Sequence, residues 1–126
     1  GKKAAGLLSE DRKSLADTEE EFYKTYDAVE NKFVENTTLG IIITNAKFSK
    51  TELCKIASMT HNGYARSIRP VHTTADGDSI YAMSVGDVSA DQDVVGTLAA
   101  QVMSEAILRA VMTAEPAYGF VSAKEL

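Results

Sequence analysis

The chain has 126 residues, of which 44% are hydrophobic and 25% are charged, the composition of a folded globular domain with one core. The net charge of −5 disfavours a nucleic-acid partner, because phosphate binding needs clustered Lys and Arg. The longest aliphatic run, Leu39 to Ile43, is interrupted by Gly40 and is far shorter than the roughly 18 residues of a membrane span, so no membrane partner is expected. The single cysteine cannot form an internal disulfide, and we expect a cytoplasmic protein.

The first 36 residues differ in charge from the rest of the chain. Between Glu10 and Glu35 there are nine acidic and four basic residues with few aliphatic ones, which is typical of a peripheral segment. Within it, DTEEEFYKTYDAVENKF predicts a helix with Thr18 as its cap. We therefore divide the chain into an acidic segment, residues 1–36, and a second segment, residues 37–126.

The second segment begins with a strongly apolar strand. Leu39, Ile41 and Ile43 line one face while Gly40 and Ile42 line the other, which predicts a strand covered on both sides. The sequence SKTE follows, in which Ser49 and Glu52 form a capping box for a helix that ends near Arg66.

A loop with an Asp76-Gly77 turn leads into a second strand, in which Ile80 and Ala82 alternate with Tyr81 and Met83 until Gly86 ends it. Ser89 and Gln92 are a second capping-box candidate before a long helix with an apolar double stripe from Val94 to Val111. The order of strand, helix, strand and helix predicts an α/β fold. Two strands make a poor sheet, so we expect this chain to be part of a larger one.

Several residues have an ordinary structural interpretation. Cys54 follows Leu53 on the predicted helix and is interpreted as a buried structural cysteine. His61 and His72 lack the spacing of zinc ligands, so no metal is expected, and His61 is interpreted as a surface or satisfied core histidine. The glycines form neither a dinucleotide fingerprint nor a phosphate loop, and no cofactor is expected.

The remaining candidates are Thr37, Thr38, Asp76 and Asp78, and they lie in recognisable motifs. NTTLGII before TNA, then GYARSIRPVHT and DGD, resemble the DmpA-like aminopeptidases, which include L-aminopeptidase/D-esterase enzymes, β-peptidyl aminopeptidases and nylon-oligomer hydrolases. The resemblance covers residues 36 to about 115. The preceding GKKAAGLLSEDRKSLADTEEE is similar to the stretch that the family carries just upstream of its cleavage point.

The resemblance implies a precursor that cuts itself between Asn36 and Thr37. Thr37 would then be the catalytic nucleophile, and its new α-amine, with a pKa of about 7.7 to 8.0, would take the hydroxyl proton. Thr38 is a supporting candidate, and Asp76 and Asp78 are candidates for orienting the ammonium group. The alternatives are a simple strand start at Thr37 and a plain Asp-Gly turn at Asp76.

The family's fold, shared with ornithine acetyltransferases, is a four-layered αββα sandwich, of which this chain would be the carboxy-terminal part. Most of the family's oxyanion and substrate-binding groups lie in the amino-terminal portion, so the implied partners are that portion, further copies of the protein and a small peptide or amide substrate. Two alternatives stay open: a catalytically silent oligomerising α/β module, and an acyl transferase like the ornithine acetyltransferases.

Overall fold

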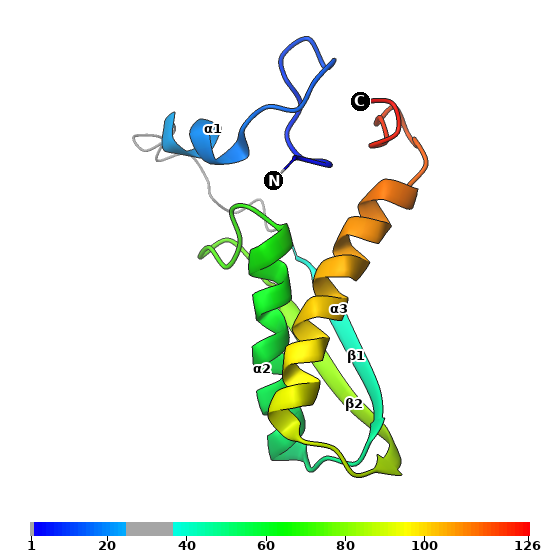
Figure 1. Cartoon of the computed structure of the whole chain (residues 1–126). Coiled ribbons are helices and arrows are strands. Elements are labelled where there is room, and N and C mark those ends of the chain that lie inside the picture. Colours follow the sequence, from blue (N-terminus) through cyan, green and yellow to red (C-terminus); the bar gives the residue numbers. More distant parts are fainter. Residues whose placement is uncertain (1, 25–36) are drawn as a thin grey trace. The chain divides into compact units, whose positions relative to one another are not determined.

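The computed structural model describes residues 2–24 and 37–126 of the chain. Their helices and strands, drawn in Figure 1, are α1 (Thr18–Lys24), β1 (Leu39–Ala46), α2 (Lys50–Ser67), β2 (Ser79–Val88) and α3 (Gln92–Thr113). The predicted order of strand, helix, strand and helix is confirmed. The chain divides into two compact units, one formed by Asn31–Glu105 and the other by Gly1–Glu30 with Ala106–Leu126.

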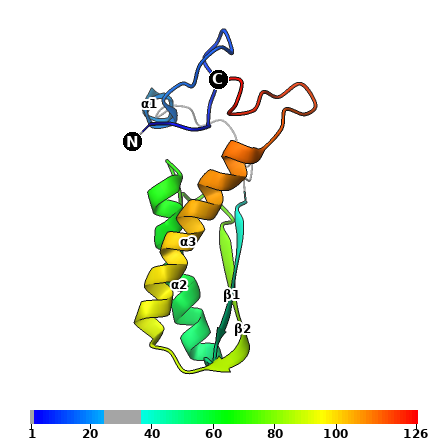
Figure 2. The same ribbon diagram turned by 45° about the vertical axis from the view of Figure 1, so that its right-hand side comes forward.

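The first of these units is a two-layer α/β structure. β1 and β2 pair in parallel, with Leu39 opposite Ser79 and Ile43 opposite Met83. α2 connects the two strands, and α2 and α3 lie side by side along the sheet (Figures 1 and 2). Both helices cover the same face, because a Cβ on Gly40 would lie 2.7 Å from Met103 Cε on α3 and 2.7 Å from Tyr64 Oη on α2.

The core is formed by one stripe of α2 against α3 and the inner face of the sheet. Ile56, Thr60, Gly63 and Tyr64 are the buried residues of α2, and they follow a helical period. The Ser49–Glu52 capping box that starts α2 is confirmed. Cys54 is exposed, so the prediction that it is buried is wrong: it lies two positions before Ile56, about 200° around the helix.

Two helices begin at caps that differ from those predicted. Asp91, rather than Ser89, caps α3, since its Oδ1 accepts the backbone N–H groups of Asp93 and Val94. Asp17, rather than Thr18, caps α1 by accepting the N–H groups of the two glutamates that follow Thr18. An aspartate carboxylate is a strong acceptor for the free N–H groups of a first turn. The rest of the predicted first helix, residues 25–33, lies outside the described residues.

β2 continues two residues beyond Gly86, where it was predicted to end. The strand pairing shifts register between Thr44 and Ala46, and Asn45 there presses its backbone against β2. A Cβ on Gly86 would lie 2.2 Å from the Asn45 carbonyl oxygen. Glycine at this position therefore permits an irregularity that keeps the two strands together.

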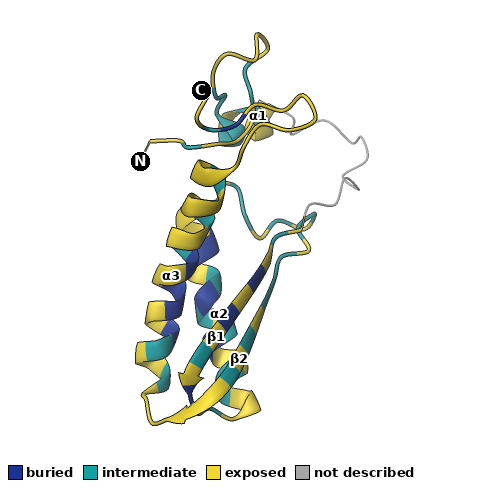
Figure 3. Ribbon diagram, turned by 90° about the vertical axis from the view of Figure 1, so that its right-hand side faces the viewer, coloured by how far each residue is buried: buried dark blue, intermediate teal, exposed yellow. Residues whose placement is uncertain are grey.

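The other side of the sheet is apolar and exposed. We call it the outer sheet face, and its side chains are between 53% and 67% exposed: Leu39, Ile41, Ile43, Tyr81, Met83 and Val85. Figure 3 shows exposed positions alternating with buried or half-buried ones along β1 and along β2 as far as Val85, after which β2 is exposed. The prediction that the first strand is covered on both faces is therefore wrong for the described residues. α2 and α3 cover only the inner face of the sheet.

α3 carries a second exposed apolar surface. Ala99, Ala100 and Met103 are buried, whereas Val94, Leu98 and Val102 are 54% to 57% exposed. By length and composition α3 could cross a membrane, a property that was not expected of any segment from the aliphatic runs in the sequence, and 22% of its 18-residue apolar stretch is buried. The core helix of a soluble protein meets the same criteria, so this finding does not assign α3 to a membrane.

The second unit combines the amino-terminal residues with the carboxy-terminal tail. Leu8 and Leu15 form an antiparallel bridge, and Lys3 pairs with Asp17 at 2.6 Å. The Arg12 guanidinium donates to the Gly119 carbonyl oxygen at 3.2 Å. This last contact joins residues that are 107 positions apart in the sequence within one unit.

Candidate functional site

The candidate residues gather at one edge of the sheet. Because β1 and β2 are parallel and Leu39 pairs with Ser79, the residues before each strand lie next to each other. Thr37 and Thr38 precede β1, and the loop Asp76–Asp78 precedes β2. Asn36 lies outside the described residues, so the geometry of the Asn36-Thr37 bond is not described.

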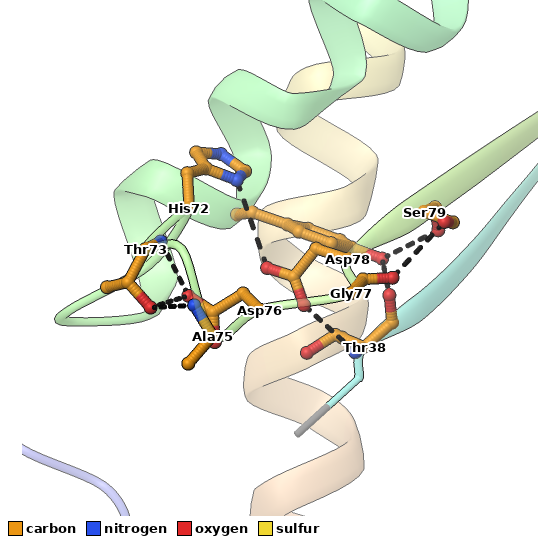
Figure 4. A network of polar contacts seen from close by, with 9 residues as sticks. Thr38, His72, Thr73, Ala75, Asp76, Gly77, Asp78 and Ser79 are labelled. Carbon is orange, nitrogen blue, oxygen red and sulfur yellow. Dashed lines mark hydrogen bonds and ion pairs between the residues drawn. The ribbon is translucent and has the colours of Figure 1, made fainter. Parts of the chain in front are cut away.

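Thr38 is held at both of its backbone polar groups. Its N–H donates to Asp78 Oδ1 at 2.9 Å, and its carbonyl oxygen accepts the Ser79 N–H at 3.0 Å. Figure 4 shows Thr38 and Asp78 facing each other across this edge. The backbone directly after Thr37 is therefore anchored to the loop before β2.

Asp78 is the carboxylate that reaches the start of β1. Its side chain is only 7% exposed, and its Oδ2 lies 3.8 Å from His72 Nδ1 (Figure 4). A buried carboxylate needs such partners, because water no longer solvates its charge. Asp78 thus places a negative charge one residue from Thr37.

Asp76 has a different set of partners. Its Oδ2 accepts the backbone N–H of Thr73 at 2.7 Å and the Thr73 hydroxyl at 2.9 Å, and its own N–H donates to the Thr73 carbonyl. The turn of this loop therefore runs from Thr73 to Asp76 with Thr74 and Ala75 at its centre, two residues earlier than the predicted Asp76-Gly77 turn. In this structure the Asp76 carboxylate holds the loop that presents Asp78.

The Thr37 hydroxyl lies against Gly77. A Cβ added at Gly77 would lie 2.7 Å from Thr37 Oγ1, which places that oxygen beside the loop between the two aspartates. Thr37 itself is exposed.

Tyr64, on α2, contacts the backbone at the start of both strands, and it was not identified as a site residue from the sequence. It is fully buried, and its hydroxyl lies 3.2 Å from the Thr38 carbonyl oxygen and 3.5 Å from the Ser79 carbonyl oxygen. Burial, with the charge of Asp78 as a second cause, raises the pKa of Tyr64, so the hydroxyl stays a proton donor.

His61 and His72 complete the cluster. Their rings meet edge to face with centroids 5.0 Å apart, and His61 also contacts Tyr64. Among the residues that the structure describes, nothing bonds to the buried His61 Nδ1, so the prediction of a satisfied core histidine is wrong, and the residue is half-buried rather than at the surface. Burial, followed by the charge of His72, lowers the pKa of His61 and favours the neutral ring, against the weaker opposing effect of Asp78. Both Tyr64 and His72 lie in the motif GYARSIRPVHT, the signal that could have drawn attention to them.

Within residues 2–24 and 37–126, no group of three or more His, Cys, Asp or Glu side chains is arranged to hold a metal ion. The chemistry available at this edge is that of a hydroxyl, a buried carboxylate and a histidine pair. These are groups for nucleophilic and acid–base catalysis.

Removing the Tyr64 hydroxyl should cost a modest amount of stability. We expect Tyr64→Phe to lower the free energy of unfolding by about 0.5 to 1.5 kcal/mol, because the Thr38 carbonyl still accepts the Ser79 N–H. Urea denaturation measures this, and Tyr23→Phe, which changes an exposed tyrosine, is the control. A Tyr64→Phe protein as stable as the wild type would show that this hydrogen bond contributes nothing.

Comparison with known proteins agrees with the resemblance seen in the motifs. An uncharacterized aminopeptidase of Mycobacterium tuberculosis is 32% identical over 106 residues, covering 72% of this chain and 31% of the relative. One from Mycobacterium leprae is 35% identical over 99 residues, covering 67% and 27%. A 6-aminohexanoate-oligomer endohydrolase of Paenarthrobacter ureafaciens is 33% identical over 88 residues, covering 60% and 25%.

The chain therefore spans about a quarter to a third of the length of these relatives. The model of peptidase family S58 matches residues 4–124, nearly the whole chain. The resemblance to the DmpA-like aminopeptidases is confirmed, and this chain belongs to peptidase family S58.

Proposed function

We propose that this chain is the nucleophile-bearing part of a self-processing amidohydrolase of the aminopeptidase type, with Thr37 as the nucleophile. The observation that carries the proposal is the edge where the Thr37 hydroxyl lies against Gly77 and Asp78 binds the next amide. The names of the relatives, aminopeptidase and oligomer endohydrolase, support hydrolysis of an amide bond. The substrate class is a small peptide, amide or ester.

The proposed reaction needs a free amine on Thr37. That amine removes the hydroxyl proton as Oγ1 attacks the substrate carbonyl, and the protonated amine then gives a proton to the departing amine. Water hydrolyses the resulting acyl-enzyme ester and restores the hydroxyl. The Asp78 carboxylate, one residue away, favours the ammonium that forms during the attack.

The remainder of the active site, in this proposal, comes from the amino-terminal portion of the same precursor. The outer sheet face carries six large apolar side chains that are each 53% to 67% exposed, and soluble proteins rarely leave a large contiguous apolar face uncovered. A second sheet packed on it would produce the four-layered αββα sandwich. Association of whole copies through the exposed Val94, Leu98 and Val102 of α3 is part of the same proposal.

We expect the isolated 126-residue chain to associate through its exposed apolar surfaces. Ile41→Lys and Met83→Lys on the outer sheet face should reduce association, and because both side chains are more than half exposed, the cost in folding stability should be small. Analytical ultracentrifugation measures the association. A monodisperse, fully folded wild-type monomer would contradict the prediction, and Lys55→Glu on the exposed side of α2 is the control.

Activity assays on the complete gene product separate the competing functions. Release of amine from small aminoacyl anilides supports the aminopeptidase, and acetyl transfer to glutamate supports an acyl transferase. If neither activity appears, the catalytically silent oligomerising module is the better interpretation. A cytoplasmic location and the absence of nucleic-acid and membrane partners remain predictions from composition.

A further inference from the structure

Gly77 is the point where the loop before β2 comes closest to Thr37. A Cβ added there would lie 2.7 Å from Thr37 Oγ1, and 3.8 Å from both Thr37 Cβ and Cγ2. Contacts below 3.0 Å essentially never occur for real Cβ atoms. The threonine oxygen therefore occupies the space beside Gly77 that any other residue would fill with its own side chain.

The backbone conformation does not explain why this residue is glycine. Among the described residues, the glycines in the left-handed region are Gly6 and Gly119. Gly77 lies outside that region, so its backbone is one that other residues adopt. It also follows the Thr73–Asp76 turn and so is not needed to make it. The close approach of the Thr37 hydroxyl is the remaining requirement for glycine.

We propose that Gly77 is a positioning residue for the Thr37 nucleophile, an inference that rests on the proposed function. Because Gly77 has no side chain, the Thr37 hydroxyl oxygen can pack directly against its α-carbon. The hydrogen bonds of Thr38 to Asp78 and Ser79 stop the following backbone from moving away. The loop and the strand edge together determine where Oγ1 lies.

A methyl group at Gly77 should move the nucleophile and leave the fold intact. Thr37 has a short side chain with one rotatable bond, and it is exposed, so rotation of the hydroxyl relieves the contact. A displacement of about 1 Å at a reacting atom can reduce a rate on the order of 100-fold.

The test is Gly77→Ala in the complete gene product, with Thr74→Val as the control at an exposed position of the same loop. We expect Gly77→Ala to slow both the break before Thr37 and the release of amine from an aminoacyl anilide on the order of 100-fold. Its melting temperature should stay within about 4 °C of the wild type. Thr74→Val should match the wild type in all three measurements.

Serine at position 37 provides a readout that a merely structural glycine would not affect. Serine lacks Cγ2, so its hydroxyl has more rotamers available beside a new methyl group. We expect Gly77→Ala to reduce the rate less in a Thr37→Ser background than in the wild type. Equal losses in both backgrounds would overturn the positioning role.

The remaining outcomes separate this inference from the proposed function. Suppose that the Thr37→Ala protein neither cleaves the bond before residue 37 nor hydrolyses the anilide, while the Gly77→Ala protein does both at the wild-type rate. The positioning role of Gly77 is then wrong, and the assignment of Thr37 as the nucleophile stands. If Thr37→Ala still breaks at the same bond, the nucleophile assignment fails first. A Gly77→Ala protein that does not fold would also overturn the inference, because it requires the fold to accept the methyl group.

Discussion

The complete gene product should break between Asn36 and Thr37 without added protease, and Thr37→Ala should abolish the break. Thr37 Oγ1 can attack the carbonyl of the preceding residue through a five-membered ring. The new C–O bond replaces the C–N bond, the freed amine takes up a proton, and water then splits the ester. Alanine lacks the oxygen that makes the attack, so intact-mass spectrometry should show a single uncut chain.

Two neighbouring substitutions show whether this hydroxyl alone is responsible. Thr37→Ser keeps the oxygen and should still break. Thr38→Val removes the adjacent hydroxyl while keeping the side-chain shape, and it should break too, because the contacts of Thr38 with Asp78 and Ser79 use its backbone. A wild-type protein that stays whole for days at neutral pH, or a Thr37→Ala protein cut at the same bond, would disprove the assignment and favour the silent module.

Asp78→Asn should lower turnover more than it lowers stability. The asparagine oxygen can still accept the Thr38 N–H, so the substitution removes charge at nearly constant volume. Losing the charge beside a developing ammonium should cost on the order of 1 to 3 kcal/mol in the transition state, which is about 5- to 150-fold in kcat. Asp78→Ala, which also leaves the Thr38 amide unpaired, should be slower still.

Asp76→Asn is the matched comparison for this prediction. Its carboxylate accepts two hydrogen bonds from Thr73, and the residue lies two positions before Asp78 in the loop. We expect turnover to fall here as well, but less than in Asp78→Asn. Steady-state kinetics with an aminoacyl anilide and urea denaturation of both variants provide the comparison. Wild-type rates in both would mean that the two aspartates serve the loop alone.

The local structure of the chain could largely be predicted from its sequence. The Ser49–Glu52 capping box and the helix after it depend on residues three or four positions apart, and both were confirmed. The cap at Ser89 was wrong because α3 begins only at Gln92, and the free N–H groups of its first turn, at Asp93 and Val94, are within reach of the Asp91 carboxylate. Cys54 was misplaced because its neighbour Leu53 was used to define the buried face, whereas Ile56 and Tyr64 define it in the structure.

The sequence by itself determined the family, the α/β order and the candidate threonine, because these depend on short motifs and local hydrophobic period. Only the tertiary structure decided which side chains share a site. Parallel pairing of β1 and β2 brings Thr38 to Asp78, 40 positions apart, and α2 adds Tyr64 beneath them. The tertiary structure also distinguishes the two aspartates, because Asp78 binds the start of β1 and Asp76 binds Thr73. The two aspartates look equivalent in the sequence, and their roles differ because strand register and loop geometry, which are properties of the fold, decide what each carboxylate reaches.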